Sequence, residues 1–157
     1  MTRSSERHVL RLERSIPAPS RAVYKALTDP QELAKWWGPR GFTATSVEFN
    51  PQVGEGYRIA MQPPDGDLFH LTGEFREVEP ATRLAYTFRW HPPHPYDRET
   101  VVTLSLDDRG DKTKVRLTQG EFATEERCAL HEAGWTESLD RLEQQLREQT
   151  LGMAPPP

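Results

Sequence analysis

Three polar side chains occur where the hydrophobic pattern points toward the interior, and their chemistry could serve a function. His131 lies one helical turn before Trp135 in an apolar stripe, where an imidazole could act as a general base or orient a ligand. Arg14 lies on the inward side of an alternating run, so it needs a carboxylate, a carbonyl or an anionic ligand as its partner. Tyr86 adds an inward phenol. A hydrogen-bonded structural histidine and a structural ion pair of Arg14 at the cavity end are the favoured alternatives, so no catalytic residue is assigned.

The residue types and their spacing support a metal site or a covalent catalytic mechanism less well than they support the roles above. His91 and His94 flank Pro92-Pro93 and could join His131 around a metal ion, but no carboxylate or thiol completes a recognisable ligand pattern. We therefore expect neither a metal nor a cofactor, and interpret this loop as the rim of a cavity. Cys128 begins a helical stripe and is interpreted as a small buried side chain. GxSxG, GxxxxGK[ST] and GxGxxG motifs are absent from the sequence, so an enzyme here would act mainly by positioning its substrate.

The strands that must position these side chains follow from the alternation of apolar and polar residues. His8–Ile16 alternates and predicts a first strand, and six further antiparallel strands are predicted between Gly41 and Gln119. The run from Phe42 to Phe49 predicts a bent strand, because these two aromatic residues have opposite parity. The residues predicted to point inward from the regular strands are Tyr57, Ile59, Met61, Phe69, Leu71, Phe75, Leu84, Tyr86, Phe88, Trp90, Val102, Leu104, Leu106, Val115 and Leu117.

Helices are predicted on both sides of this strand region. Arg21–Thr28 forms a short helix that stops at Asp29; Asp29 caps a second short helix, with Pro30 at its first position and Glu32 completing a capping box. Thr124 opens a longer C-terminal helix. Its apolar stripe consists of Cys128, His131, Trp135, Leu139, Leu142 and Leu146.

This order of elements predicts an α+β fold. A curved antiparallel sheet of seven strands must cover its apolar face, and the long C-terminal helix is the amphipathic element available to do so. The sheet is therefore expected to wrap around that helix, with two short helices following strand one. We expect one domain at residues 8–150, with disordered ends at residues 1–7 and in the Pro-rich tail 151–157.

Composition excludes several classes of partner. The 157 residues carry a formal net charge of −4 and no cluster of Lys and Arg, so nucleic acid and anionic membranes are not expected partners. No apolar run approaches the ~18 residues needed to cross a bilayer. A single cysteine excludes an intramolecular disulfide, and the N-terminus lacks the apolar region of a signal peptide, so a cytoplasmic location is expected.

A cavity is expected where the twisted sheet and the long helix diverge, because such a sheet cannot contact one helix uniformly. A dry pocket of ~300 Å³ would cost about 7 kcal/mol, close to the whole stability of a domain, so a pocket of that size should hold water or a ligand. The residues expected to bind a ligand there are Trp36, Trp37, Tyr57, Ile59, Met61, Phe69, Leu71, Phe75, Tyr86, Phe88, Trp90, Leu104, His131, Trp135 and Leu139.

Several motifs, taken in order and spacing, resemble a known family. They are LTDP at 27–30, WWGP at 36–39, PPDG at 63–66 and the trio His131, Gly134 and Trp135. Over roughly residues 8–147 the chain resembles the SRPBCC superfamily, and within it the branch related to the C-terminal domain of the activator of the heat-shock-protein-ninety ATPase. The resemblance implies the helix-grip fold of the birch-pollen allergen and START domains, in which a curved sheet grips a long helix over a hydrophobic cavity.

Three functions remain open, because members of this superfamily bind lipids and other hydrophobic ligands, cyclise polyketides, sequester toxic compounds or act as co-chaperones. The first is binding of a small aromatic or lipid-like molecule. The second is a cyclase or hydrolase that uses His131, Arg14 and Tyr86. The third is an interaction module that contacts a chaperone or a second copy of the chain. The eukaryotic co-chaperone carries an additional N-terminal domain, whereas about seven residues precede the first strand here, so stimulation of a chaperone ATPase is not expected.

Overall fold

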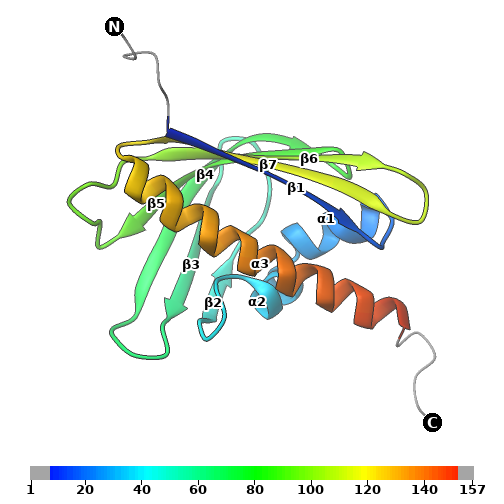
Figure 1. Cartoon of the computed structure of the whole chain (residues 1–157), viewed down its shortest axis with the longest axis horizontal. Coiled ribbons are helices and arrows are strands. Elements are labelled where there is room, and N and C mark those ends of the chain that lie inside the picture. The colour runs from blue at the N-terminus through cyan, green and yellow to red at the C-terminus, as the bar shows by residue number, and fades with distance from the viewer. Residues whose placement is uncertain (1–7, 152–157) are drawn as a thin grey trace, which may run out of the picture.

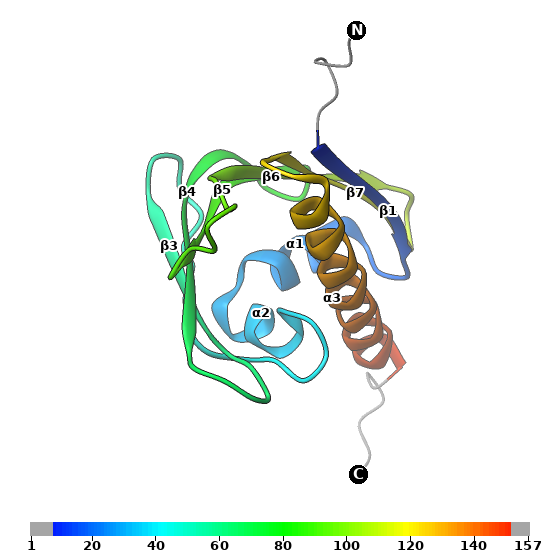
Figure 2. The same cartoon turned by 60° about the vertical axis from the view of Figure 1, so that its left-hand side comes forward.

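The computed structural model describes residues 8–151, which form one seven-stranded antiparallel sheet and three helices (Figure 1). The sheet order is β1-β7-β6-β5-β4-β3-β2. Figure 2 shows the sheet curving around the two short helices, with the long helix lying along its concave side. The predicted α+β helix-grip fold is therefore confirmed. The elements are β1 His8–Ile16, α1 Ser20–Thr28, α2 Pro30–Trp36, β2 Thr43–Glu48, β3 Gly56–Gln62, β4 Phe69–Glu79, β5 Arg83–His91, β6 Thr100–Asp108, β7 Thr113–Phe122 and α3 Glu125–Leu151.

The ends of the chain lie largely outside this range. The expectation of disorder at residues 1–7 and 152–157 falls on residues that are not described, whereas Leu151 is the last residue of α3. Within residues 8–151, no helix is both long enough and apolar enough to cross a membrane.

The junction of α1 and α2 forms as the capping pattern predicts, with one difference. The Asp29 carboxylate accepts hydrogen bonds from the backbone N–H groups of Gln31 (2.9 Å) and Glu32 (3.2 Å). The second half of the capping box is absent, because the backbone N–H of Asp29 already donates to the carbonyl of Lys25 at the end of α1. The Glu32 carboxylate instead accepts a hydrogen bond from Gln145 of α3 at 3.0 Å, which ties the helical pair to the long helix.

The first strand is joined to the long helix by an ion pair. The Arg14 guanidinium lies 2.6 Å from Asp140 and 3.3 Å from Glu143, both on α3. The structural ion pair predicted for an inward arginine is present, but it was predicted at the cavity end, and none of its three residues lines the cavity. Sequence reasoning did not identify its acidic partners. Because Arg14 is not among the residues that line the cavity described below, its charge is used to hold β1 against α3.

At Gly73 of β4, the Tyr57 ring and the Thr87 carbonyl group lie where a side chain would otherwise be. Gly73 pairs with Tyr57 in the β3 and β4 ladder, and the Tyr57 hydroxyl donates to the carbonyl of Thr87 at 2.6 Å. A Cβ at Gly73 would lie 1.9 Å from the Thr87 carbonyl oxygen and 2.5 Å from the Tyr57 ring. The absent side chain therefore leaves room for the ring to cross β4 and reach β5.

We expect Gly73→Ala to lower the free energy of unfolding by about 3 kcal/mol, because the Thr87 carbonyl oxygen that the new Cβ would meet cannot move without breaking the ladder. Urea unfolding measures this effect. Gly134→Ala is the control: a Cβ there would meet Pro39 at an ordinary 3.7 Å, and replacing a helical glycine should raise stability by about 1 kcal/mol. A Gly73→Ala chain with wild-type stability would contradict this account of the sheet.

Candidate functional site

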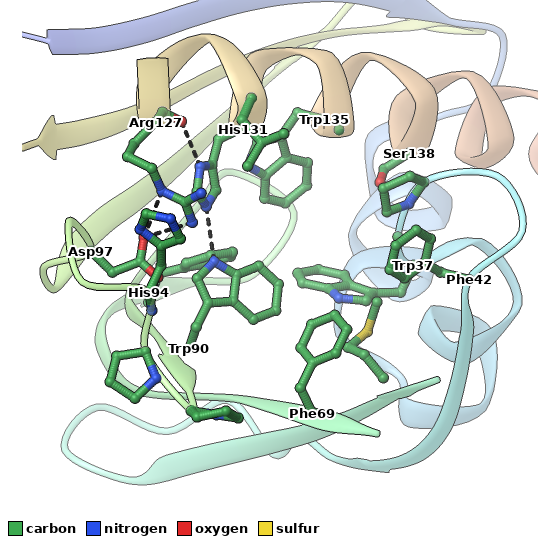
Figure 3. A pocket seen from close by; sticks show the side chains of 18 of the residues that line it. Trp37, Phe42, Phe69, Trp90, His94, Asp97, Arg127, His131, Trp135 and Ser138 are labelled. Atoms are coloured by element: carbon green, nitrogen blue, oxygen red, sulfur yellow. Dashed lines mark hydrogen bonds and ion pairs between the residues drawn. The ribbon is translucent and has the colours of Figure 1, made fainter. Parts of the chain in front are cut away.

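A cavity of about 590 Å³ lies at the end of the sheet where β3, β4 and β5 diverge from the first half of α3 (Figure 3). The segment after α2 and the β5–β6 loop complete its wall. Its surface is mainly aromatic and aliphatic. The residues that line it are Trp37, Gly38, Pro39, Phe42, Met61, Phe69, Phe88, Trp90, Pro92, Pro93, His94, Pro95, Asp97, Arg127, Leu130, His131, Gly134, Trp135 and Ser138.

The structure brings about half of the predicted ligand-binding residues together on this wall. Those on the wall are Trp37, Met61, Phe69, Phe88, Trp90, His131 and Trp135. The others are buried in the core and do not line the cavity. They are Trp36, Tyr57, Ile59, Leu71, Phe75, Tyr86, Leu104 and Leu139.

Position along the strands separates the two groups. Phe69 begins β4 and Trp90 lies near the end of β5, so both reach the cavity end of the sheet. Farther along the same two strands, Phe75 pairs with Tyr86, and Phe49 fills the space between them with ring centroids at 4.9 and 5.8 Å. Alternation identifies which side chains of a strand point inward. It does not show where along the strand the packed core ends and the cavity begins.

Tyr86 is the clearest case of this difference. Its ring is enclosed by Phe49, Tyr57 and Phe75, which form with it the aromatic cluster of the core, and burial raises the pKa of its phenol far above the ordinary value. Since Tyr86 lies away from the cavity wall, the geometry gives no support to the acid/base role considered for it.

Sequence reasoning missed much of the wall. Helical spacing could have located Gly134 and Ser138, which lie three and seven residues after His131 on α3. Phe42 has the opposite parity to Phe49 and lines the cavity because β2 contains an irregularity between Ala44 and Ser46. Phe42 could be placed on the cavity wall only from the tertiary structure.

His131 is held by hydrogen bonds at both ring nitrogens. An indole N–H can only donate, so Nε2 of His131 accepts from Nε1 of Trp90 at 2.9 Å. Nδ1 then carries the proton and donates to the Arg127 carbonyl at 2.7 Å. Burial is the main cause that lowers the pKa of His131, which favours this neutral form. With both nitrogens engaged, the imidazole positions Trp90 and has no free site to accept a substrate proton.

An ion pair joins the β5–β6 loop to the first turns of α3. Nε and a terminal nitrogen of Arg127 lie 2.9 and 2.7 Å from the same oxygen of Asp97, and the two side chains are only 15% and 10% exposed. The other Asp97 oxygen accepts from the backbone N–H of His94 at 2.9 Å. Among the described residues that line the cavity, Arg127 and Asp97 are the only Arg, Lys, Asp or Glu side chains, and they neutralise each other.

The histidines of the loop have separate partners. Nε2 of His91 lies 2.8 Å from the Thr72 hydroxyl, and Nδ1 of His94 accepts from the backbone N–H of Tyr96 at 3.1 Å. No group of three or more His, Cys, Asp or Glu side chains within residues 8–151 could hold a metal ion. Burial and the nearby Glu132 and Glu125 raise the pKa of the Cys128 thiol, which disfavours a reactive thiolate.

Arg141 positions the segment that carries Trp37. Its guanidinium donates to the carbonyls of Lys35 (3.1 Å), Trp37 (3.3 Å), Gly38 (2.8 Å) and Pro39 (3.3 Å), which are at or just beyond the C-terminal end of α2. These carbonyls lack partners within the helix, and a cation there also suits the helix dipole. One α3 side chain thus holds the backbone of the segment that carries Trp37.

Residues 17–147 match the family described as Activator of Hsp90 ATPase homolog 1-like protein. The chain belongs to this family. The match confirms the resemblance found in the motifs, and it covers both short helices, the sheet from β2 onward and most of α3. No curated protein matches the chain.

Several solved structures share this fold. The AHSA1 protein SPO3351 from Silicibacter pomeroyi is 26% identical, with a TM-score of 0.79 over 90% of this chain and 99% of that one. Protein CV1439 from Chromobacterium violaceum is 27% identical, with a TM-score of 0.78 over 88% and 96%. DynU16, from the dynemicin biosynthetic locus, is 25% identical, with a TM-score of 0.72 over 90% of this chain and 48% of that one.

The buried state of His131 leads to a testable pH dependence. Its pKa in the folded chain lies below the ordinary value of about 6.5, so between these two values the unfolded chain binds more protons. The contribution of His131 to the free energy of unfolding is therefore fully present above about pH 6.5, and it decreases as the pH falls toward the pKa of the folded chain.

NMR titration of the His131 ring should give a midpoint below 6.5. His131→Gln should reduce the pH dependence of the urea unfolding free energy below pH 6.5. A midpoint at or above 6.5 would contradict the hydrogen-bond assignment.

Proposed function

We propose that this protein binds a neutral, mainly apolar small molecule with an aromatic ring system between the sheet and α3. The observation that carries the proposal is a cavity of about 590 Å³ whose wall includes the indoles of Trp37, Trp90 and Trp135. Ligand sites for small molecules have volumes of about 300 to 1,000 Å³ and mainly apolar walls with a few polar groups. Both features are present here.

The energetics of the cavity support an occupant. At ~24 cal/mol per Å³, a dry void of this volume would cost roughly 14 kcal/mol, which is comparable with the entire stability of a domain. The cavity must therefore contain solvent or a ligand. Water is poorly accommodated by an aromatic wall, so displacing it with an apolar molecule is favourable.

The aromatic wall favours an aromatic ligand. Trp37 contacts Trp135 edge to face at a centroid distance of 5.4 Å, and Trp90 contacts Phe69 at 5.2 Å and Phe88 at 5.1 Å. A guest ring can extend these arrays, and each well-oriented aromatic pair contributes about 0.5 to 1.5 kcal/mol beyond area burial. The mutual neutralisation of Arg127 and Asp97 leaves no counter-charge for an ionic ligand, which favours a neutral one.

Binding is better supported than catalysis by the residues of the wall. Both nitrogens of His131 are used within the protein, Arg14 pairs with acidic residues of α3, and Tyr86 is enclosed in the core. The three residues considered for an enzyme thus serve packing and positioning. The relative DynU16 belongs to a biosynthetic locus, which is consistent with small-molecule ligands for this fold.

The proposal is tested by filling the cavity from α3. Gly134 lies on the wall, and a Cβ there has ordinary contact distances, so Gly134→Phe should place a ring in the cavity without straining the backbone. We expect the neutral dye N-phenyl-1-naphthylamine to bind the wild-type chain at one site with a saturable rise in fluorescence. Gly134→Phe should weaken this binding at least tenfold, because the new ring occupies the guest's volume.

Gly134→Ala is the matched control and should bind the dye nearly as well as the wild-type chain. Bound ligand at ~100 times its dissociation constant should also stabilise the fold by about 2.7 kcal/mol, which a thermal-shift measurement detects. Equal dye binding by the wild-type and Gly134→Phe chains would place the site elsewhere. Failure of the wild-type chain to bind the dye or any member of a broad library of neutral aromatic compounds would contradict the proposed function.

A further inference from the structure

The tryptophans of this chain differ in one respect that bears on the ligand. Three of the four donate their indole N–H within the protein: Trp36 to the Ala26 carbonyl at 2.8 Å, Trp90 to His131 at 2.9 Å and Trp135 to Gln119 at 2.7 Å. The fourth is Trp37, which is 4% exposed and finds no acceptor within residues 8–151. It is also a residue of the cavity wall.

Among the buried serine and threonine hydroxyl groups of the described residues, one likewise has no hydrogen-bond partner. Ser20, Thr87, Thr100 and Thr113 each make a side-chain hydrogen bond to another described residue. Ser138 is 4% exposed, and its hydroxyl has no partner in the described part of the chain. Ser138, like Trp37, lines the cavity.

Figure 3 shows both side chains among those that surround the cavity. Trp37 projects from the segment after α2 toward Trp90, and Ser138 comes from the adjacent part of α3. A dashed line joins the Trp90 nitrogen to His131, whereas none reaches Trp37 or Ser138. The two donors without a partner among the described residues therefore lie on the side of the cavity formed by α3 and the segment after α2.

Unpaired donors in a protein interior need a physical explanation. More than nine in ten buried polar groups have a hydrogen-bond partner, and an unpaired one carries the desolvation penalty of its group. An indole N–H cannot accept a hydrogen bond, so its partner must be an acceptor. The Tyr86 hydroxyl also lacks a described partner, but it lies in the aromatic cluster and not on the wall, so it gives no information about a guest.

We propose that the guest is a neutral aromatic carbonyl compound whose oxygen accepts a hydrogen bond from the Trp37 indole or the Ser138 hydroxyl, the two wall donors without a partner among the described residues. This inference rests on the proposed function and specifies its ligand class. The carbonyl end lies toward α2 and α3, and the ring system extends toward Trp90, whose own N–H is already donated to His131. A pure hydrocarbon would leave both donors unpaired and would bind less well than a ketone of the same shape.

The test compares 9-fluorenone with fluorene, two rigid molecules of nearly equal shape that differ by a carbonyl group in place of a methylene group. Dissociation constants are measured by tryptophan fluorescence or calorimetry for the wild-type chain and for Trp37→Phe and Ser138→Ala. The readout is the ratio of the fluorene to the fluorenone constant. Lost contact area changes both constants, whereas a lost hydrogen bond changes only that of fluorenone.

We expect this ratio to fall about fivefold in Trp37→Phe or Ser138→Ala, the effect of one ordinary hydrogen bond. Trp90→Phe is the matched control: it removes a wall indole whose N–H is already engaged, so it should weaken both compounds equally and leave the ratio unchanged. Circular dichroism verifies folding, and Ser138→Ala, a favourable helix substitution, keeps the test valid if Trp37→Phe is unstable.

The outcomes separate the two proposals. If both compounds bind and the ratio stays constant within twofold in Trp37→Phe and Ser138→Ala, the carbonyl assignment is overturned while the proposed binding function stands. If the wild-type chain binds neither compound and also fails to bind N-phenyl-1-naphthylamine, the binding function fails and this inference with it.

Discussion

α3 packs closely against the curved sheet over only part of its length, and the position of the cavity follows from this incomplete contact. The second half of α3 is packed: Leu139, Leu142 and Leu146 are almost fully buried. Its first half presents His131 and Trp135 to a cavity. One straight helix cannot follow a strongly twisted sheet over its whole length, so close packing at one end opens space at the other. The short helices and the aromatic cluster fill the closed end.

The wall of the cavity is held by polar interactions that connect distant parts of the chain. Asp97 in the β5–β6 loop binds Arg127, the Arg127 carbonyl accepts from His131, and His131 accepts from Trp90 on β5. On the other side, Arg141 binds the carbonyls that follow α2. These hydrogen bonds and the ion pair connect the β5–β6 loop, β5, α3 and the segment after α2 around the apolar wall. The unpaired donors on this wall stand out because its other polar groups are paired.

Much of the architecture could be predicted from local patterns. Alternation located the strands, the Asp29 cap separated the short helices, and an inward Arg14 signalled an ion pair, because each of these depends on a few neighbouring residues or on one unfavourable burial. The wall of the site was only half predictable. Phe75 and Tyr86 obey the same alternation as Phe69 and Trp90, yet they lie in the core, because the position of Phe49 decides where packing stops.

Periodicity and motif spacing are properties of neighbouring residues. Local patterns were therefore enough to predict the order of elements, the inward side of each strand, the apolar stripe of the long helix and the resemblance to the family. Which aromatic residues meet, and which polar groups of the described residues pair or have no partner, follows from contacts between segments that are distant in the sequence. Whether the N–H of Trp37 or that of Trp90 finds an acceptor depends on segments far apart in the chain. No local pattern encodes those distances, because they are set by sheet curvature, helix position and register together.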